Sequence, residues 1–345
     1  QWGSAEQQFL RAAPAAYFDG LNQPAGLDLP SARAVSNTFF AQNELEPNLT
    51  YASDFFWLWG QFIDHDLDLT RGESGEFLPI LVPQGDVYFD PFNTGTVIIP
   101  FERSHAHDGT GVTTPREHTN DITAFIDASM VYGSDAGRAA FLRDAGGKLK
   151  ISDGDLMPFN DGTQANAGGD STNLFVAGDV RANENSGLSS LHTLFVREHN
   201  RLVDELSVKY PDLTDDELYS QAKAIVEAEI QAITFNEFLP LLLGESAVTN
   251  YTGYENTVDP QIANEFATAA YRLWHTMLSG TLLRLNEDGS AHANGHLSLR
   301  DAFFNPSVIV NDGVDPILTG AAASRAETID LSIIDDVRNF LFGPP

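Results

Sequence analysis

Cysteine is absent from this sequence of 345 residues, so disulfide bridges and thiolate metal sites are excluded. Basic residues are scarce: 19 lysines and arginines stand against 49 aspartates and glutamates, which gives a formal net charge of −30. A nucleic acid, or any other polyanion that needs a basic surface, is therefore not expected as a partner. The acidity suits cation binding, and it serves solubility equally well.

Long apolar runs are also lacking. No stretch approaches the roughly 18 residues that a membrane-spanning helix needs, so we expect no membrane span. No charged segment followed by an apolar one begins the sequence, so we expect no signal peptide within it. The hydrophobic content of 42% and the aromatic content of 10% are typical of a globular protein. Without internal repeats or a linker-like stretch, residues 1–345 are predicted to form a single domain.

Apolar residues recur with helical spacing in several segments. This period predicts helices over residues 51–67, 189–210, 215–244, 260–283 and 328–342. Between residues 72 and 120 the chain is instead rich in Gly, Pro, Asp, Thr and His, which indicates long loops with short strands at most. The predicted fold class is mainly α, with long loops and little β structure.

The stretch WLWGQFIDHDLDLT (57–70) places acids beside a histidine in an otherwise apolar helix. Gln61, Asp64 and His65 stand at i, i+3 and i+4, so their side chains share one side of the helix. Asp66 lies about 100° further round the helix, so it can face a second ligand while His65 faces the first. A lone histidine on a helix is usually a satisfied core residue. Three polar groups on one face of an aromatic-rich helix weaken that interpretation considerably.

A second polar pattern occurs in DITAFIDASMVYGSD (121–135). If this segment is extended, its alternate residues share one side and can offer hydroxyl, carbonyl and carboxylate oxygens to a hard cation. The residues concerned are Thr123, Phe125, Asp127 and Ser129, with Asp66 completing the set from the helix. Taken alone, the segment fits an ordinary half-buried strand with a Ser/Thr face better.

Two further pairs of polar residues are candidates for a functional site, and within each pair the residues are three positions apart. Arg181 and Glu184 stand in DVRANENSG (179–187), just before a predicted helix. Arg272 and His275 stand in YRLWHTM (271–277), within an apolar segment. Either pair alone is weak support for a site, because an Arg beside a Glu is most often a surface ion pair.

Taken together, these segments resemble the animal-type haem peroxidases of the peroxidase–cyclooxygenase superfamily. The matching stretches, in family order, are WGQFIDHDLDLT, TAFIDASMVYGS, LHTLFVREHNRL with the preceding Arg181 and Glu184, and AAYRLWHTM. The resemblance implies the helical fold of that family, haem b and Ca²⁺ as cofactors, and an extracellular, secreted protein. Hydrogen peroxide would be its oxidant, and a halide, a pseudohalide or a small phenol its electron donor.

The resemblance also implies a role for each cavity residue. His65 would be the distal histidine that moves the peroxide proton, and Arg181 would stabilise the charge that develops as the O–O bond breaks. Gln61 would line the distal cavity. His275 would be the proximal iron ligand, and Arg272 would meet a haem propionate.

Metal and haem attachment follow from the same resemblance. The implied calcium ligands are Asp66, Thr123, the Phe125 carbonyl, Asp127 and Ser129. Asp64 and Glu184 match the two carboxylates that form ester links to haem methyl groups in mammalian members, so two such links are available.

Three departures from the family pattern narrow the expectation. Asn185 stands where one mammalian member has a methionine bonded to haem, which argues against efficient chloride oxidation. Arg272 stands where cyclooxygenases carry their radical tyrosine, and Tyr271 precedes it by one residue, so fatty-acid dioxygenation ranks below peroxidation. The sequence also ends at RNFLFGPP, before a family segment whose asparagine bonds the proximal histidine. A second polypeptide supplies that part, the sequence is partial, or haem binding is altered.

A second function class remains to be weighed, namely a non-catalytic, calcium-bound peroxidase-like module used for adhesion or matrix assembly. The presence of His65, Arg181 and His275 together argues against it, since a drifted pseudoenzyme is expected to have lost at least one of the three. Calcium-dependent melting without turnover would distinguish this module from a peroxidase.

Overall fold

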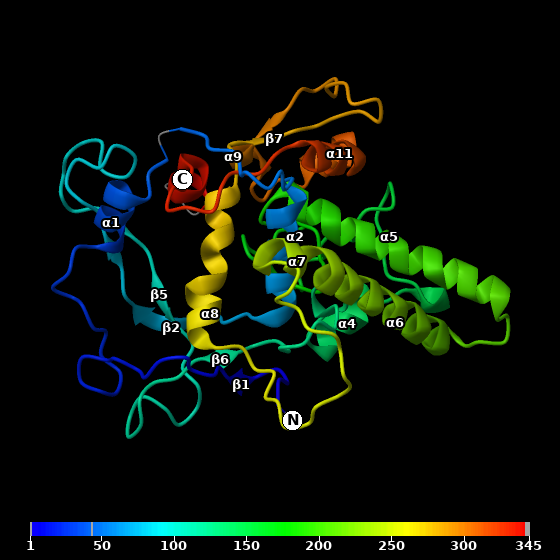
Figure 1. Ribbon diagram of the computed structural model, residues 1–345, viewed down its shortest axis with the longest axis horizontal. Helices are drawn as coiled ribbons and strands as arrows, with labels where there is room; N and C mark the ends of the chain where they lie inside the picture. Colours follow the sequence, from blue (N-terminus) through cyan, green and yellow to red (C-terminus); the bar gives the residue numbers. More distant parts are fainter. Residues whose placement is uncertain (1, 43, 342–345) are drawn as a thin grey trace.

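The central element of the fold is the helix α2 (Phe55–Leu67), in a computed structural model that describes residues 2–42 and 44–341. Residues on every side of α2 are buried, which is the pattern of a helix enclosed by other elements. It contacts the helix α5 (Ser186–Lys209), the short helix α3 (Ser129–Tyr132) and the 3-10 helix η3 (Ala270–Met277). Figure 1 shows α2 in the middle of the molecule, between α5 and η3.

The two longest helices, α5 and α6 (Asp215–Ile233), run side by side in opposite directions (Figure 1). Asn185 caps α5 by accepting a hydrogen bond from Leu188 N, and Thr214 and Glu217 form a reciprocal capping box on α6. The π-helix η2 (Thr234–Phe238) and α7 (Leu239–Leu243) continue α6 until Gly244 ends it at a φ of 93°. The predicted helices over 189–210 and 215–244 are therefore confirmed.

The predicted helix over residues 260–283 is wrong as a single element. The chain forms α8 (Asn264–Thr268), breaks at Ala269, continues as η3, and then pairs as the strand β7 (Thr281–Leu282). Residues three apart eclipse one another in a 3-10 helix. Tyr271, Trp274 and Met277 accordingly form one buried row, while Arg272 and His275 form a second row that is half-buried.

The predicted helix over 328–342 is also largely wrong. Only Asp336–Phe340 is helical, as the π-helix η4, and residue 342 lies outside the described residues. The backbone before η4 pairs with a distant segment instead, since Ile333 forms a parallel β-bridge with Ala41. A segment whose backbone pairs with a distant strand cannot also make the local bonds of a helix.

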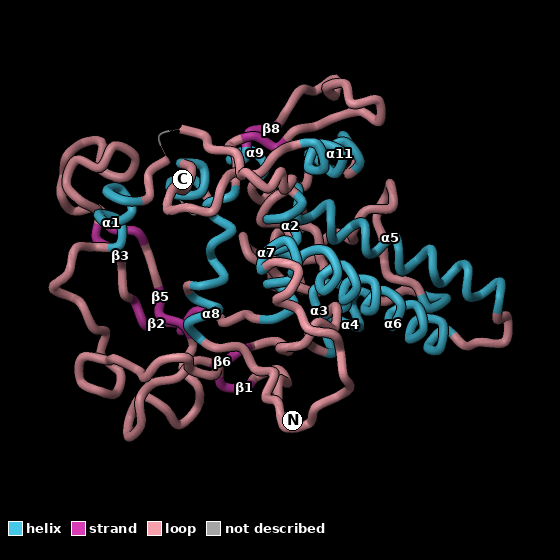
Figure 2. The backbone as a smooth tube through the Cα atoms, viewed as in Figure 1, coloured by secondary structure: helices cyan, strands magenta, loops and turns pink. Residues whose placement is uncertain are grey.

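Short elements make up the remainder (Figure 2). The other helices are α1 (Ala32–Phe39), α4 (Ala136–Leu142), η1 (Ala145–Gly147), α9 (Leu299–Ala302), α10 (Ser307–Asp312) and α11 (Asp315–Ala323). The other strands are β1 (Gln7–Gln8), β2 (Gly72–Phe77), β3 (Ile80–Leu81), β4 (Ile98–Ile99), β5 (Glu102–Ser104), β6 (Thr119–Asn120) and β8 (Leu297–Ser298).

The strands pair antiparallel in twos, as β1–β6, β2–β5, β3–β4 and β7–β8. This arrangement confirms the mainly α fold and the long loops with short strands over residues 72–120. None of the helices within residues 2–42 and 44–341 is both long and apolar enough to cross a bilayer.

Gly60 lets α2 approach η3 closely, because an added Cβ would lie 2.6 Å from two indole atoms of Trp274. We expect Gly60→Ala to lower the free energy of unfolding by about 1–3 kcal/mol, since the indole would have to move within a packed core. Urea denaturation measures this change. Gly137→Ala in α4 is the control, where a Cβ would meet only the Asp135 side chain at 3.2 Å. Equal stabilities of the two variants would contradict the prediction.

Candidate active site

The haem-side residues singled out in the sequence come together around one cavity of about 220 Å³. They come from three places, namely α2, the loop before α5, and η3. From these elements the cavity is lined by Gln61, Asp64, His65, Arg181, Glu184, Arg272 and His275. Aromatic side chains, among them Trp57, Trp274 and Phe303, provide much of the apolar wall.

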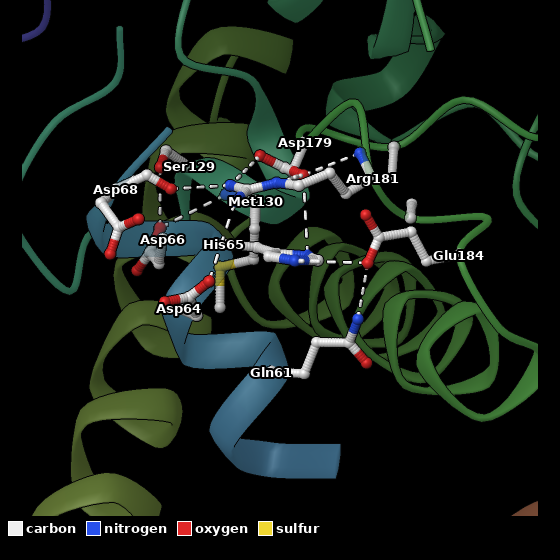
Figure 3. Close-up of polar contacts among 12 residues, drawn as sticks. Gln61, Asp64, His65, Asp66, Asp68, Ser129, Met130, Asp179, Arg181 and Glu184 are labelled. Atoms are coloured by element: carbon white, nitrogen blue, oxygen red, sulfur yellow. Dashed lines mark hydrogen bonds and ion pairs between the residues drawn. The ribbon is translucent and has the colours of Figure 1, made fainter. Parts of the chain in front are cut away.

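His65 lines this cavity and is almost fully buried. Figure 3 shows its ring among the side chains of Asp179, Arg181 and Glu184. Its Nδ1 is 3.6 Å from Asp179 Oδ1, and its Nε2 is 4.0 Å from Glu184 Oε2. Burial, reinforced by the nearby Arg181 charge, holds the pKa of the imidazole well below its usual range. The ring is therefore neutral at pH 7 and has a lone pair with which to accept a proton.

Arg181 is held by two acceptors beside His65. Its Nε and Nη2 each donate to the Asp179 carboxylate at 2.9 Å, and Nη2 also donates to the Asp68 carbonyl at 2.8 Å. Burial alone would lower the pKa of the guanidinium, but the Asp179 carboxylate raises it, so the charge is kept. Burial would likewise raise the pKa of Asp179, and the Arg181 charge keeps that pKa below its usual range. Sequence reasoning missed Asp179, although it stands only two residues before Arg181.

Gln61 is clamped between the two residues that precede α5. Its Nε2 donates to Glu184 Oε2 at 2.8 Å, and its Oε1 accepts from Asn185 Nδ2 at 2.9 Å. These two contacts fix which end of the amide faces the carboxylate. Figure 3 shows the contact to Glu184. Asn185 thus both caps α5 and orients a cavity side chain.

Burial raises the pKa of Glu184 from 4.5 to about 7. A carboxyl whose pKa is raised on folding stabilises the protein below its unfolded pKa, and this contribution is lost as pH rises through the folded pKa. Glu184→Gln removes the titration. We therefore expect the variant to gain about 1–3 kcal/mol relative to the wild type between pH 5 and pH 8.

Urea melts across this pH range test the Glu184 prediction, with Glu245→Gln at an exposed position as the control. The control is expected to follow the wild type at each pH. A constant difference between Glu184→Gln and the wild type from pH 5 to pH 8 would contradict the prediction.

Arg272 is the ion-pair partner of two acids, Asp64 and Asp68. Its Nη1 donates to Asp64 Oδ2 at 2.8 Å, and its Nη2 donates to Asp68 Oδ1 at 3.2 Å. Asp64 also lies 3.8 Å from the Arg181 guanidinium. Burial and the Asp64 charge raise the pKa of Asp68 to about 7. Asp64 therefore has two arginine partners, and Asp68, which bonds Arg272, is a further residue that the sequence reasoning did not select.

His275 faces the same cavity from η3. Burial lowers the pKa of its imidazole to about 4, so it is a neutral ring of the kind that ligates iron. Among the described residues, Asp64 Oδ1, the Tyr271 hydroxyl and Trp274 Nε1 are buried without a hydrogen-bond partner. A neutral imidazole, apolar aromatic walls, an arginine for a carboxylate, and partnerless polar atoms fit a haem group.

The residues predicted to bind calcium also lie close together. Asp66 is fully buried; its carboxylate accepts from Ser129 Oγ at 2.7 Å and from the backbone amides of Ala128 and Met130. Thr123 Oγ1 donates to Asp127 Oδ2 at 2.9 Å, and Ser129 N donates to Asp127 Oδ1. Burial and the Asp127 charge raise the pKa of Asp66 to about 7.

The expected extended conformation of this segment is wrong. Bends lead through residues 122–127 to Ala128, whose φ is 59°, and α3 begins at Ser129. Phe125 lies within these bends, and its side chain is partly exposed. The described residues contain no cluster of three or more His, Cys, Asp or Glu side chains arranged to hold a metal ion. Any ion here would rely on Asp66, Asp127 and uncharged oxygens.

Helical elements thus bring two neutral histidines and two arginines to one cavity with apolar aromatic walls, a set of groups that fits a haem. An animal haem peroxidase family model matches residues 1–345, and the chain belongs to this family. It is 36% identical to the peroxidasin homolog of Mus musculus over 369 residues, covering 92% of this chain and 25% of the relative. It is also 36% identical to human eosinophil peroxidase over 393 residues, covering 99% and 54%.

The fold of this chain is also similar to that of a solved peroxidase structure. Peroxidase A from Dictyostelium discoideum superposes on this chain with a TM-score of 0.91 at 31% identity, covering 100% of this chain and 69% of that one. The chain thus spans about a quarter to a half of the length of the two curated relatives above.

Proposed function

We propose that this chain is the haem-binding part of a peroxidase that reduces hydrogen peroxide and oxidises a halide, a pseudohalide or a small phenolic donor. One observation carries the proposal: the neutral His65, the charged Arg181 and the neutral His275 line the same cavity. An acid–base group, a fixed positive charge and an iron ligand are the groups that splitting a peroxide bond at a haem requires.

Bound haem would supply the redox-active iron. His275 would bind it, Arg272 would pair with a propionate, and Asp64 and Glu184 would be available for ester links. Arg272 bonds the Asp64 and Asp68 carboxylates, so a propionate would pair with its guanidinium by sharing it with these two acids or by displacing one of them.

His65, Arg181 and Gln61 would each have a separate role toward the peroxide. Because Nδ1 of His65 faces Asp179, its Nε2 is the atom available to take the proton from one peroxide oxygen and return it to the other. The Arg181 guanidinium would stabilise the negative charge on the departing oxygen. Gln61, fixed by Glu184 and Asn185, would hold water or the donor anion beside them.

An extracellular location belongs to the same proposal. The experiment that tests it is titration of the chain with haem, followed by mixing with hydrogen peroxide. We expect a Soret band that saturates at one haem per chain and changes on addition of peroxide. Intact mass after denaturation would count any ester links and reveal any second chain.

The proposal would be overturned if haem failed to bind to this chain and also to a version extended by the C-terminal part found in the relatives. Calcium-dependent melting combined with bound haem but no peroxide reaction would favour a non-catalytic module instead.

Calcium at Asp66 is proposed as the second cofactor, with Thr123, the Phe125 carbonyl, Asp127 and Ser129 as the other ligands. We expect saturating calcium to add about 2–3 kcal/mol to the stability. Asp66→Ala should abolish that gain and slow the peroxide reaction of the haem-loaded protein, because Asp66 adjoins His65 on α2. Thermal melting with calcium or a chelator measures the first effect and stopped-flow mixing the second.

The control for this test is Asp161→Ala, which removes an exposed aspartate that bonds its neighbour Thr163. Since the pKa of Asp66 is about 7, calcium must compete with a proton, and its affinity should fall as the pH is lowered below 7. An equal calcium response in Asp66→Ala and the wild type would exclude this site.

A further inference from the structure

Asp179 is a buried carboxylate at the back of the distal site, and its backbone is fixed from several sides. Its amide donates to the Met130 carbonyl at 3.0 Å, and its own carbonyl accepts from Arg138 Nη2 at 3.2 Å. The preceding Gly178 packs so closely that a Cβ would lie 2.2 Å from the Ser129 carbonyl oxygen. The segment therefore cannot shift without disturbing α3, and the carboxylate has a defined position.

This carboxylate is the strongest anchor of Arg181. Oδ1 accepts from Arg181 Nε and from its backbone amide, at 2.9 and 2.8 Å, and Oδ2 accepts from Nη2 at 2.9 Å. Two parallel contacts fix the plane of a guanidinium as well as its position. The Asp68 carbonyl, by contrast, contacts a single nitrogen and leaves the plane free to rotate.

The same carboxylate also faces His65. Oδ1 lies 3.6 Å from Nδ1, an atom that has no hydrogen-bond partner among the described residues. Contacts at catalytic sites are often long in the absence of ligands and tighten when the ligand binds. A carboxylate opposite Nδ1 favours the tautomer with its proton on Nδ1, which leaves the Nε2 lone pair free.

We propose that Asp179 is the positioning residue of the distal site, a single carboxylate that orients both the His65 ring and the Arg181 guanidinium toward the peroxide. The inference rests on the proposed function, because it assumes that these two residues act on peroxide. In this proposal the Asp179 side chain sets the position of the His65 ring relative to the Arg181 guanidinium. Figure 3 shows Asp179 next to both of them.

The decisive variant is Asp179→Asn, which keeps the size of the side chain but replaces one acceptor with an NH₂ group that opposes the guanidinium. We expect the haem-loaded variant to react with hydrogen peroxide about 100-fold more slowly, with an unchanged haem dissociation constant. This loss should shrink in an Arg181→Ala background and in a His65→Ala background, because one fewer group is left to orient. An equal loss in all three backgrounds would overturn the proposal.

Position and charge are separated by Asp179→Glu, which keeps the charge but moves it by one methylene. We expect this variant also to react more slowly than the wild type, and a wild-type rate would overturn the proposal. If Asp179→Asn failed to fold, Asp179→Glu would decide the question by itself. Asp54→Asn is the matched control. Asp54 is as buried as Asp179 and bonds Trp57 Nε1, but it lies at the N-terminal end of α2, whereas His65 lies near the C-terminal end. This control should leave the peroxide rate unchanged.

A readout without haem comes from the Arg181 Nε–H resonance in proton–nitrogen NMR spectra of the chain, assigned by its loss in Arg181→Lys. Asp179→Asn should shift this resonance and speed its exchange with solvent, whereas Asp54→Asn should not. An unmoved resonance would overturn the inference. If the wild type bound haem but ignored peroxide while the resonance still moved, the proposed function would fail and the anchoring of Arg181 by Asp179 would stand.

Discussion

His65→Ala is expected to slow the reaction of the haem-loaded protein with hydrogen peroxide by about 10²–10⁴-fold, the range that a positioned acid–base group contributes. His65 lines the cavity, is buried and is neutral, so it can take a proton at pH 7. Without it, peroxide would have to lose its proton to water. Stopped-flow spectroscopy of the Soret band measures the rate constant directly.

Two comparisons make the His65 result specific. Arg181→Ala removes the charge beside it and should cost about 10²–10³-fold, the size of effect seen when one donor to a developing negative charge is lost. His292→Ala, in an exposed loop outside the cavity, should leave the rate constant unchanged. A His65→Ala rate constant within about threefold of the wild type would rule out proton transfer by this residue, since that range is far below the contribution of an acid–base group.

The second large effect concerns haem retention. His275→Ala should abolish the saturable Soret band, because the variant has no imidazole on η3 to bind the iron. Among the described residues, the other η3 side chains with polar atoms at the cavity wall are Tyr271, Arg272 and Trp274. Arg272 and Trp274 only donate hydrogen bonds, and burial raises the pKa of Tyr271, so its hydroxyl keeps its proton. Equilibrium titration with haem, followed by gel filtration, measures the loss.

Restoring the ligand separates iron binding from a folding defect. His275→Gly with free imidazole should regain a Soret band, since the imidazole can occupy the space of the lost side chain. His107→Ala is the control, because His107 lies in a loop and its Nδ1 already contacts Thr119 Oγ1 at 3.1 Å. If His275→Gly bound haem as tightly as the wild type without imidazole, His275 would not be the proximal ligand.

The long helices were predictable because their signals are local. The capping box at Thr214 and the stop at Gly244 lie within the segments that they delimit, so the periodicity between them could be read directly. The errors occurred where distant contacts compete with local preference. The break at Ala269 and the bridge between Ala41 and Ile333 depend on residues far apart in the chain.

In the site, too, local patterns were predictable and contacts between distant residues were not. The spacing of Gln61, Asp64 and His65 determined that they share one side of a helix, and the motifs as a whole determined the family to which the chain belongs. Asp68 and Asp179 escaped notice because their partners identify them, and those partners are found only in space. Asp68 meets Arg272 across 204 residues of chain, and Asp179 meets His65 from a separate loop.

The sequence by itself determined the helical framework, the family, and the residue types available for chemistry, because these depend on short-range spacing and on side-chain identity. Only the tertiary structure decided the protonation of those residues. The neutral His65, the neutral His275 and the charged Arg181 result from burial and from partners brought together by folding. The pKa of a side chain depends on the charges and solvent around it, and no linear pattern of residues specifies that surrounding.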